Sequence, residues 1–172
     1  EEKSTKKLDG TLKVVTTGDA YQPLFDKFTE EVGPKVEFIS MSSGEVLSKL
    51  KAEGGTPAAD LWFGGGIDAF MDAKDNNLLE KVDFDAADEL SPDFKDSDNY
   101  WFSKGVTVVG FIVNNDILKE KGLEAPKTWD DLTKEEYQGE VLMSNPAISG
   151  TNYAVVNALL QTKGQDEGWK YF

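Results

Sequence analysis

The stretch VLMSNPAISGTNYAVVNALL, residues 141–160, has the pattern of a strand, a loop and a helix. An apolar run typical of a short β-strand is followed by a turn at Asn145-Pro146. Ser149-Gly150-Thr151 then opens a segment in which apolar residues recur at helical spacing. A helix start presents unpaired backbone N–H groups and the positive end of a dipole, and a glycine beside two hydroxyls leaves room for an anion. The loop therefore indicates either an anion site or a helix start capped by Ser149 or Thr151.

The same pattern occurs three times in the first half of the chain. Each time, a β-rich run ends in a loop of hydroxyl, glycine or acidic residues, and a helical pattern follows. The third run, residues 59–63, is nearly all apolar, so we expect it to be buried on both faces. Such units predict an α/β fold with a doubly wound parallel sheet, whose ligands bind at the carboxyl ends of the strands. The loops expected at that edge are Thr17-Gly18-Asp19, Ser42-Ser43-Gly44 and Gly64-Gly65-Gly66.

The second half of the chain predicts fewer elements. Residues 107–113 (TVVGFIV) read as a long strand, and the change in composition near Asn114 is the best candidate for a domain boundary. Thr128 is a candidate helix N-cap, and a further helix is expected within residues 161–172. We therefore predict a flexible leader at 1–10, a first α/β lobe at 11–113 and an incomplete second α/β lobe at 114–172, which is thin for an independent core.

Composition excludes several classes of function. The formal net charge is −14, which disfavours nucleic acid and anionic membrane surfaces as partners. The sequence has no cysteine and no histidine, so disulfides, Cys/His zinc sites and histidine catalysis are ruled out within it. All 18 basic residues are lysine, so a bound anion would be held by backbone N–H groups, hydroxyls or a lysine instead of a guanidinium. No apolar run is long enough to predict a membrane span.

No motif indicates catalysis. The acidic run 83–90 lacks the glycine and the glutamate spacing of a calcium loop, and a solvated acidic surface is the better interpretation. Gly64-Gly65-Gly66 is followed by neither the lysine nor the hydroxyl of a phosphate-binding loop. Trp62 and Tyr100-Trp101 read as packing aromatics, with a stacking wall for a ligand as the alternative. No nucleophile is placed beside a base, so binding without turnover is the simpler account, and no cofactor is predicted.

Six segments carry a family resemblance: LKVVTTGDAYQPLFDKF (12–28), SSGE (42–45), GGTPAADLWFGGG (54–66), VTVVGFIVNNDILKEKGL (106–123), APKTWDDL (125–132) and EVLMSNPAISGTNY (140–153). In this order they resemble the extracellular solute-binding proteins of ABC importers. More narrowly, they are similar to the ferric-iron branch, which also contains sugar-phosphate and phosphonate binders. The resemblance implies a type II periplasmic-binding-protein fold, in which two α/β lobes close on a ligand. It also implies that the chain is truncated, since the remainder of the second lobe and the return to the first are missing.

The resemblance carries roles to particular positions. Iron-binding members commonly use a neighbouring tyrosine pair from the later part of the chain, and this sequence has neither that pair nor a histidine, so iron is neither supported nor excluded. The Ser149-Gly150-Thr151 step favours an oxyanion. The matching first-lobe ligand residues are Thr17, Gly18, Asp19, Ser42, Ser43, Gly44, Gly64 and Gly65, and those of the second lobe are Asn145, Ser149, Gly150 and Thr151.

The leading hypothesis is a transport protein that captures a small solute or ion in an interlobe cleft and delivers it to an ABC permease in the membrane. Lobe closure on the ligand would be its mechanism. The resemblance implies an extracellular or periplasmic location after removal of a signal peptide, with a lipid anchor on the outer face of the cytoplasmic membrane as one option. The alternatives are a small enzyme, with Asp19 and Glu45 as its acid-base pair, and a sensory ligand-binding module.

Overall fold

A computed structural model describes residues 7–172. By contacts between residues the chain forms two compact units. The first contains the described residues up to Val106 together with Ala147–Gly150, and the second contains Thr107–Pro146 and Thr151–Phe172. The first long segment of the second unit thus begins at Thr107. The boundary between lobes expected near residue 114 stays a prediction.

A parallel three-stranded sheet forms the centre of the first unit. Its strands are β1 (Thr11–Thr16), β2 (Lys35–Ser40) and β3 (Leu61–Phe63), in the order β2-β1-β3. Both neighbours of β1 run parallel to it. The α/β class and the parallel sheet predicted from the repeated strand-loop-helix pattern are therefore confirmed.

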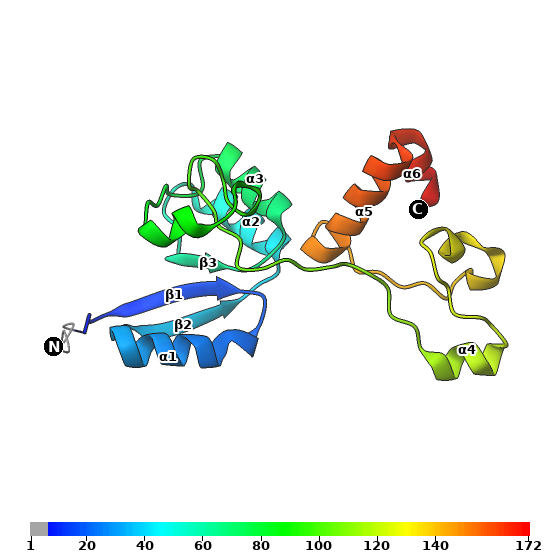
Figure 1. The fold of residues 1–172 in the computed structure, drawn as a ribbon, viewed down its shortest axis with the longest axis horizontal. Coiled ribbons are helices and arrows are strands. Elements are labelled where there is room, and N and C mark those ends of the chain that lie inside the picture. Colours follow the sequence, from blue (N-terminus) through cyan, green and yellow to red (C-terminus); the bar gives the residue numbers. More distant parts are fainter. Residues whose placement is uncertain (1–6) are drawn as a thin grey trace. The chain divides into compact units, whose positions relative to one another are not determined.

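Helices cover both faces of this sheet, as the doubly wound prediction requires. Figure 1 shows α1 (Gln22–Val32) on one face, and α2 (Ser43–Glu53) and α3 (Ile67–Asp75) on the other. Phe25 of α1 packs edge to face against Phe38 and Phe63, with ring centroids 5.2 and 5.1 Å apart. On the opposite face, Phe70 of α3 stacks on Trp62 at 4.1 Å. Alternation along β3 explains the two faces, because Trp62 and Phe63 point in opposite directions.

The third strand corrects one expectation. We expected β3 to be buried on both faces, but the Leu61 side of the strand is partly open, with 37% of that residue exposed. The physical reason is position, because β3 lies at the edge of the sheet while β1, in the centre, contains the fully buried Val14. An apolar composition indicates burial on folding but does not say which strand is central.

The N-terminal leader was expected to be flexible over residues 1–10, and residues 1–6 lie outside the described residues. The described end of the leader is attached to the sheet. The N–H of Leu8 donates to the carbonyl of Val32 at 2.8 Å, and the N–H of Lys35 donates to the carbonyl of Gly10 at 3.0 Å.

An acidic segment between α3 and Val106 carries short 3-10 helices at Asp85–Glu89 and Pro92–Phe94. Its acidic face is solvated, as expected, and it is anchored to α3 by an ion pair. The Nζ of Lys74 lies 2.7 Å from the Asp96 carboxylate, which is itself buried. This carboxylate also accepts from the N–H groups of Asp98 and Tyr100.

The second unit is helical. It contains α4 (Asn115–Lys121), the 3-10 helices Asp130–Thr133 and Glu135–Tyr137, most of α5 (Gly150–Lys163) and α6 (Gln165–Tyr171). Trp129 packs against Phe111 at 5.3 Å, and its carbonyl accepts from the Tyr171 hydroxyl. The helix expected within residues 161–172 is confirmed as α6, which begins only at Gln165 because α5 continues to Lys163. The helix expected after Thr128 is a 3-10 helix.

Two predicted strands are wrong. Residues 107–113 and the apolar start of the 141–160 stretch form no strand. Val108, Ile112 and Leu142 are almost fully exposed, at 95%, 100% and 96%. A strand forms only when a neighbour pairs with its backbone, and the second unit has no strand among its described residues. The β pattern of these segments therefore lacks a partner here.

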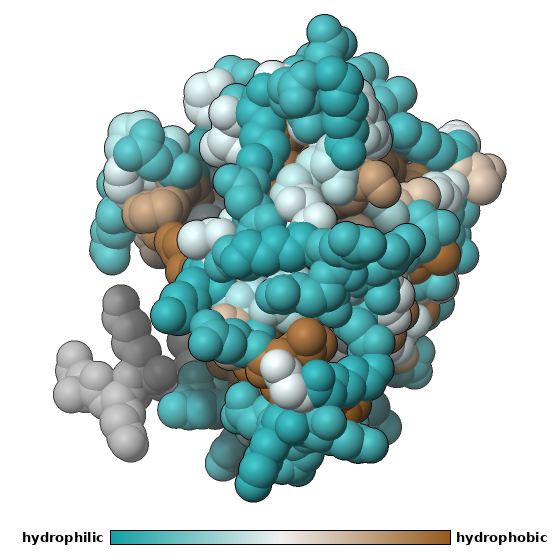
Figure 2. Space-filling view, turned by 90° about the vertical axis from the view of Figure 1, so that its right-hand side faces the viewer, coloured by the Kyte–Doolittle hydropathy of each residue, from teal (hydrophilic) through white to brown (hydrophobic). Residues whose placement is uncertain are grey.

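One face, drawn in Figure 2, is covered mainly by hydrophilic side chains with small apolar areas between them. Among residues 7–172, no helix has the length and apolar character needed to span a membrane.

Candidate functional site

The three first-lobe loops lie at one edge of the sheet, as the sequence predicted. The register pairs Thr16 at the end of β1 with Ser40 of β2 and with Phe63 of β3. Residues 17–19, 42–44 and 64–66 therefore leave the sheet side by side at its carboxyl edge. This edge is the usual ligand site of an open α/β sheet.

Ser43 ties two of these loops together. Its side chain is buried, with 3% of the residue exposed, and its Oγ accepts from the N–H of Gly66 at 3.3 Å. A Cβ on Gly65 would lie 2.5 Å from this Oγ, and one on Gly150 would lie 2.9 Å from it. The loops meet so closely here that only glycine fits opposite the serine.

Residues 147–150 lie against the start of α2. The N–H of Gly44 donates to the carbonyl of Ile148 at 3.1 Å, and a Cβ on Gly44 would meet the carbonyl oxygen of Ala147 at 2.1 Å. Ser149 and Gly150 thus belong to the first unit by contact. Asn145 and Thr151 are exposed and belong to the second unit.

The start of α2 is also capped by its own side chains, which is the alternative to an anion site at such a loop. Ser42 and Glu45 form a capping box, in which each side chain accepts from the other's backbone N–H. The Ser42 hydroxyl, followed by its backbone N–H, lowers the pKa of the Glu45 carboxyl by donating to it. The capping box and the hydrogen bond from the Gly44 N–H to the Ile148 carbonyl use most of the backbone N–H groups at the N-terminus of α2.

The first loop is more open than the others. Thr17 and Asp19 are exposed, and Gly18 precedes a 3-10 helix, Asp19–Tyr21, without a side-chain cap. The enzyme alternative requires Asp19 and Glu45 to act as an acid-base pair, and no contact joins them among residues 7–172.

Sequence reasoning missed two residues at this edge, Tyr21 and Lys104. The Nζ of Lys104 lies 4.0 Å from the centroid of the Tyr21 ring and 5.3 Å from that of Phe63, and it is hydrogen-bonded to the Tyr21 hydroxyl. The residues are 83 positions apart and form no motif. The sequence offers only a general indication, because without arginine the positively charged side chain beside a bound anion must be a lysine.

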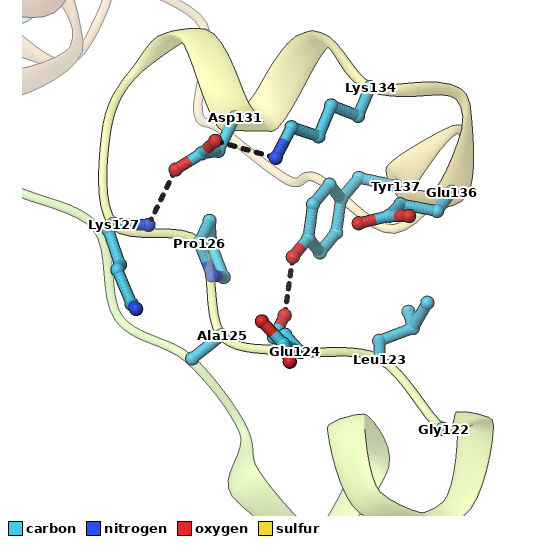
Figure 3. A pocket seen from close by; sticks show the side chains of 10 residues that line it. All are labelled: Gly122, Leu123, Glu124, Ala125, Pro126, Lys127, Asp131, Lys134, Glu136 and Tyr137. Atoms are coloured by element: carbon cyan, nitrogen blue, oxygen red, sulfur yellow. Dashed lines mark hydrogen bonds and ion pairs between the residues drawn. The ribbon is translucent and has the colours of Figure 1, made fainter.

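A hollow in the second unit lies apart from all predicted site residues. It has a volume of about 390 Å³, and some of its polar groups bond to one another (Figure 3). Asp131 accepts from the N–H of Lys127 at 2.9 Å and pairs with Lys134 at 2.8 Å, while the Tyr137 hydroxyl donates to the carbonyl of Glu124. The Lys134 ammonium, and then the backbone donors, hold the pKa of Asp131 far below its usual range. These contacts stabilise the loop that lines the hollow.

Comparison with known proteins places the chain in a family. Residues 57–172 match the family model described as bacterial extracellular solute-binding protein. The chain belongs to this family. The resemblance predicted from the loop motifs is thereby confirmed.

Solved structures similar to this solute-binding protein have the type II periplasmic-binding-protein fold. The periplasmic binding protein AfuA of Actinobacillus pleuropneumoniae, solved with fructose-6-phosphate, superposes with a TM-score of 0.87 at 30% identity. The match covers 94% of the chain and 53% of AfuA. The predicted fold class is therefore confirmed, for part of such a protein.

Sequence relatives cover a similar share. A protein from Haemophilus influenzae strain Rd is 33% identical over 84% of this chain and 43% of its own length. The phosphoglycerate transport regulatory protein PgtC of Salmonella typhimurium is 42% identical over 39% of the chain and 17% of PgtC. More distant relatives are named for 2-aminoethylphosphonate binding and for iron uptake. The solute-binding chain thus spans about half the length of the relatives it matches most extensively.

Proposed function

We propose that this chain is part of a substrate-binding component of an ABC importer, and that its solute carries an oxyanion such as a phosphate ester or phosphonate. The observation that carries the proposal is the meeting of three loops at the carboxyl edge of the sheet. They place glycines and hydroxyls within one small region of the first unit, where the N–H groups of Gly44 and Gly66 already donate to Ile148 and Ser43 and the remaining loop N–H groups could face a solute. Such groups recognise oxyanions without a guanidinium.

The names of similar proteins support the same class of solute. AfuA was solved with a sugar phosphate, and PgtC is named for phosphoglycerate transport. Capture of such a solute would be followed by delivery to a membrane permease, in the extracellular space or the periplasm. Binding without turnover is proposed because the loops present no nucleophile paired with a base. The residues proposed to contact the solute are the loop residues predicted from the sequence, at 17–19, 42–44, 64–65, 145 and 149–151.

Ferric iron is the second candidate solute, and it rests on relatives named for iron uptake. Among residues 7–172, no three or more carboxylates lie close enough together to hold a metal ion. Native mass spectrometry of the complete protein as purified distinguishes the two, because a co-purified ligand is identified by its mass. A phosphate ester or phosphonate supports the oxyanion proposal, whereas iron alone would overturn it.

Removing the loop hydroxyls tests the site. We expect Ser149→Ala and Thr151→Ala each to weaken binding of fructose 6-phosphate by the complete protein about tenfold, because each loses a hydrogen bond to a charged group. Isothermal titration calorimetry measures the affinity, and thermal unfolding is expected to change little. Ser48→Ala, at an exposed position of α2, is the matched control. Unchanged affinity with lowered thermal stability would mean that these hydroxyls only cap their helix.

A further inference from the structure

A lysine at the carboxyl edge of the sheet is held against aromatic rings. The Nζ of Lys104 lies 4.0 Å from the centroid of Tyr21 and is hydrogen-bonded to the hydroxyl of that ring. Phe63, the last residue of β3, lies beneath the same ammonium at 5.3 Å. The two rings pack edge to face, with centroids 5.0 Å apart. A cation over such rings is attracted by their negative faces, which fixes a side chain that would otherwise be mobile.

The backbone also fixes where Lys104 stands. The N–H of Ser103 donates to the carbonyl of Phe94 at 2.7 Å, and its hydroxyl donates to the carbonyl of Gly105 at 2.8 Å. The lysine therefore projects from a tight, hydrogen-bonded turn. Its position follows from the packing of the acidic segment and not from a long flexible loop.

Gly64 leaves room for this side chain. It adopts a φ of +93°, and a Cβ there would lie 3.1 Å from the Cε of Lys104. Gly64 was predicted from the sequence as a ligand-loop residue. The lysine stem and a predicted ligand loop thus share one corner of the sheet edge.

The charge of Lys104 is not neutralised by a carboxylate. Most ammonium groups that make close polar contacts in this protein pair with an acid, as Lys74 does with Asp96 at 2.7 Å. Lys104 lies within ion-pair distance of no carboxylate among residues 7–172, and its side chain is exposed. In a chain with a net charge of −14 and no arginine, an accessible cation fixed at the ligand edge is the local feature that would attract an anion.

We propose that Lys104 is the cation that binds the phosphate or phosphonate group of the solute, with Tyr21 as its positioning residue. This inference rests on the proposed function and adds the residue that selects for the oxyanion. An ammonium is a compact charge with three donors; the Tyr21 hydroxyl accepts one of them, and two are left for a tetrahedral oxyanion. The Tyr21 ring and hydroxyl would hold the ammonium at the loop edge before the solute arrives.

The test compares Lys104→Met with Lys104→Arg in the complete protein. We expect Lys104→Met to bind fructose 6-phosphate at least tenfold more weakly in calorimetry, and Lys104→Arg to keep most of the affinity because it keeps the charge. Lys27→Met, which removes an exposed lysine of α1, is the matched control and is expected to bind normally. Thermal unfolding of each variant establishes that it is folded. 2-Aminoethylphosphonate and inorganic phosphate, titrated in parallel, distinguish a phosphonate, an ester and the free anion as the preferred source of the group.

A double-mutant cycle tests the role given to Tyr21. Tyr21→Ala is expected to weaken binding in the wild-type background and to have little further effect beside Lys104→Met, because it acts through the lysine. If the Lys104→Met variant binds fructose 6-phosphate as tightly as the wild type does, this inference is overturned and the proposed function stands. If the wild type binds none of the three probes but binds ferric iron, the oxyanion proposal itself is overturned.

Discussion

Replacing Gly44 with alanine is expected to destabilise the protein by about 2–3 kcal/mol, the range for overpacking a tight contact with loss of a hydrogen bond. The new Cβ would lie 2.1 Å from the carbonyl oxygen of Ala147 and 2.9 Å from that of Ile148. Both contacts are with backbone, which cannot move aside as a flexible side chain can. Residues 147–150 would have to leave α2, and the bond from the Gly44 N–H to Ile148 would be lost.

The expected loss of stability is opposite in sign to the usual effect of this substitution. Within a helix, glycine to alanine ordinarily stabilises by about 0.5–1 kcal/mol, because alanine restricts the unfolded chain. A drop in the thermal unfolding midpoint of about 5–10 °C is expected here instead. Gly18→Ala is the matched control, since a Cβ at Gly18 meets nothing within 4 Å. A raised midpoint for Gly44→Ala would show that residues 147–150 do not dock on α2.

The sequence was sufficient to predict the sheet edge but not its contacts. Local patterns determine where a strand gives way to a loop, and parallel connectivity then brings loops such as 17–19 and 42–44 to the same side. The approach of Ser43 to Gly150, and of Lys104 to Tyr21, joins residues far apart in the chain. No local pattern encodes such contacts, so they could not be predicted from one sequence.

The failed strands have a related cause. Residues 107–113 have the composition of a buried strand, but composition expresses a preference for a pleated, half-buried surface and does not supply the neighbour. In this chain Val108 and Ile112 stay exposed. The three strands that did form share one sheet, in which β1 pairs on both sides. Pairing is therefore what separates the successful predictions from the unsuccessful ones.

Replacing Asp96 with alanine is expected to cost about 2 kcal/mol, because it removes the acceptor for one ammonium and two backbone N–H groups. The Lys74 Nζ lies 2.7 Å from this carboxylate, and the N–H groups of Asp98 and Tyr100 lie at 3.1 and 3.2 Å. Without it, the acidic segment loses its anchor on α3. Asp98→Ala is the control, since Asp98 also pairs with Lys74 but its side chain is 64% exposed, and the expected loss is below about 1 kcal/mol.

The pH dependence of this difference identifies its origin. Burial of Asp96 opposes ionisation, but the bonds from Lys74, Tyr100 and Asp98 outweigh it and lower the pKa of the carboxyl in the folded state. A carboxyl with a lowered folded pKa stabilises the protein above its unfolded pKa of about 4, and this stability is lost as the pH falls through the folded value. The gap in unfolding midpoint between wild type and Asp96→Ala should therefore be full at pH 6 and shrink steadily below about pH 4. A gap that stays constant down to pH 2 would mean that Asp96 stabilises the segment by packing and not by its charge.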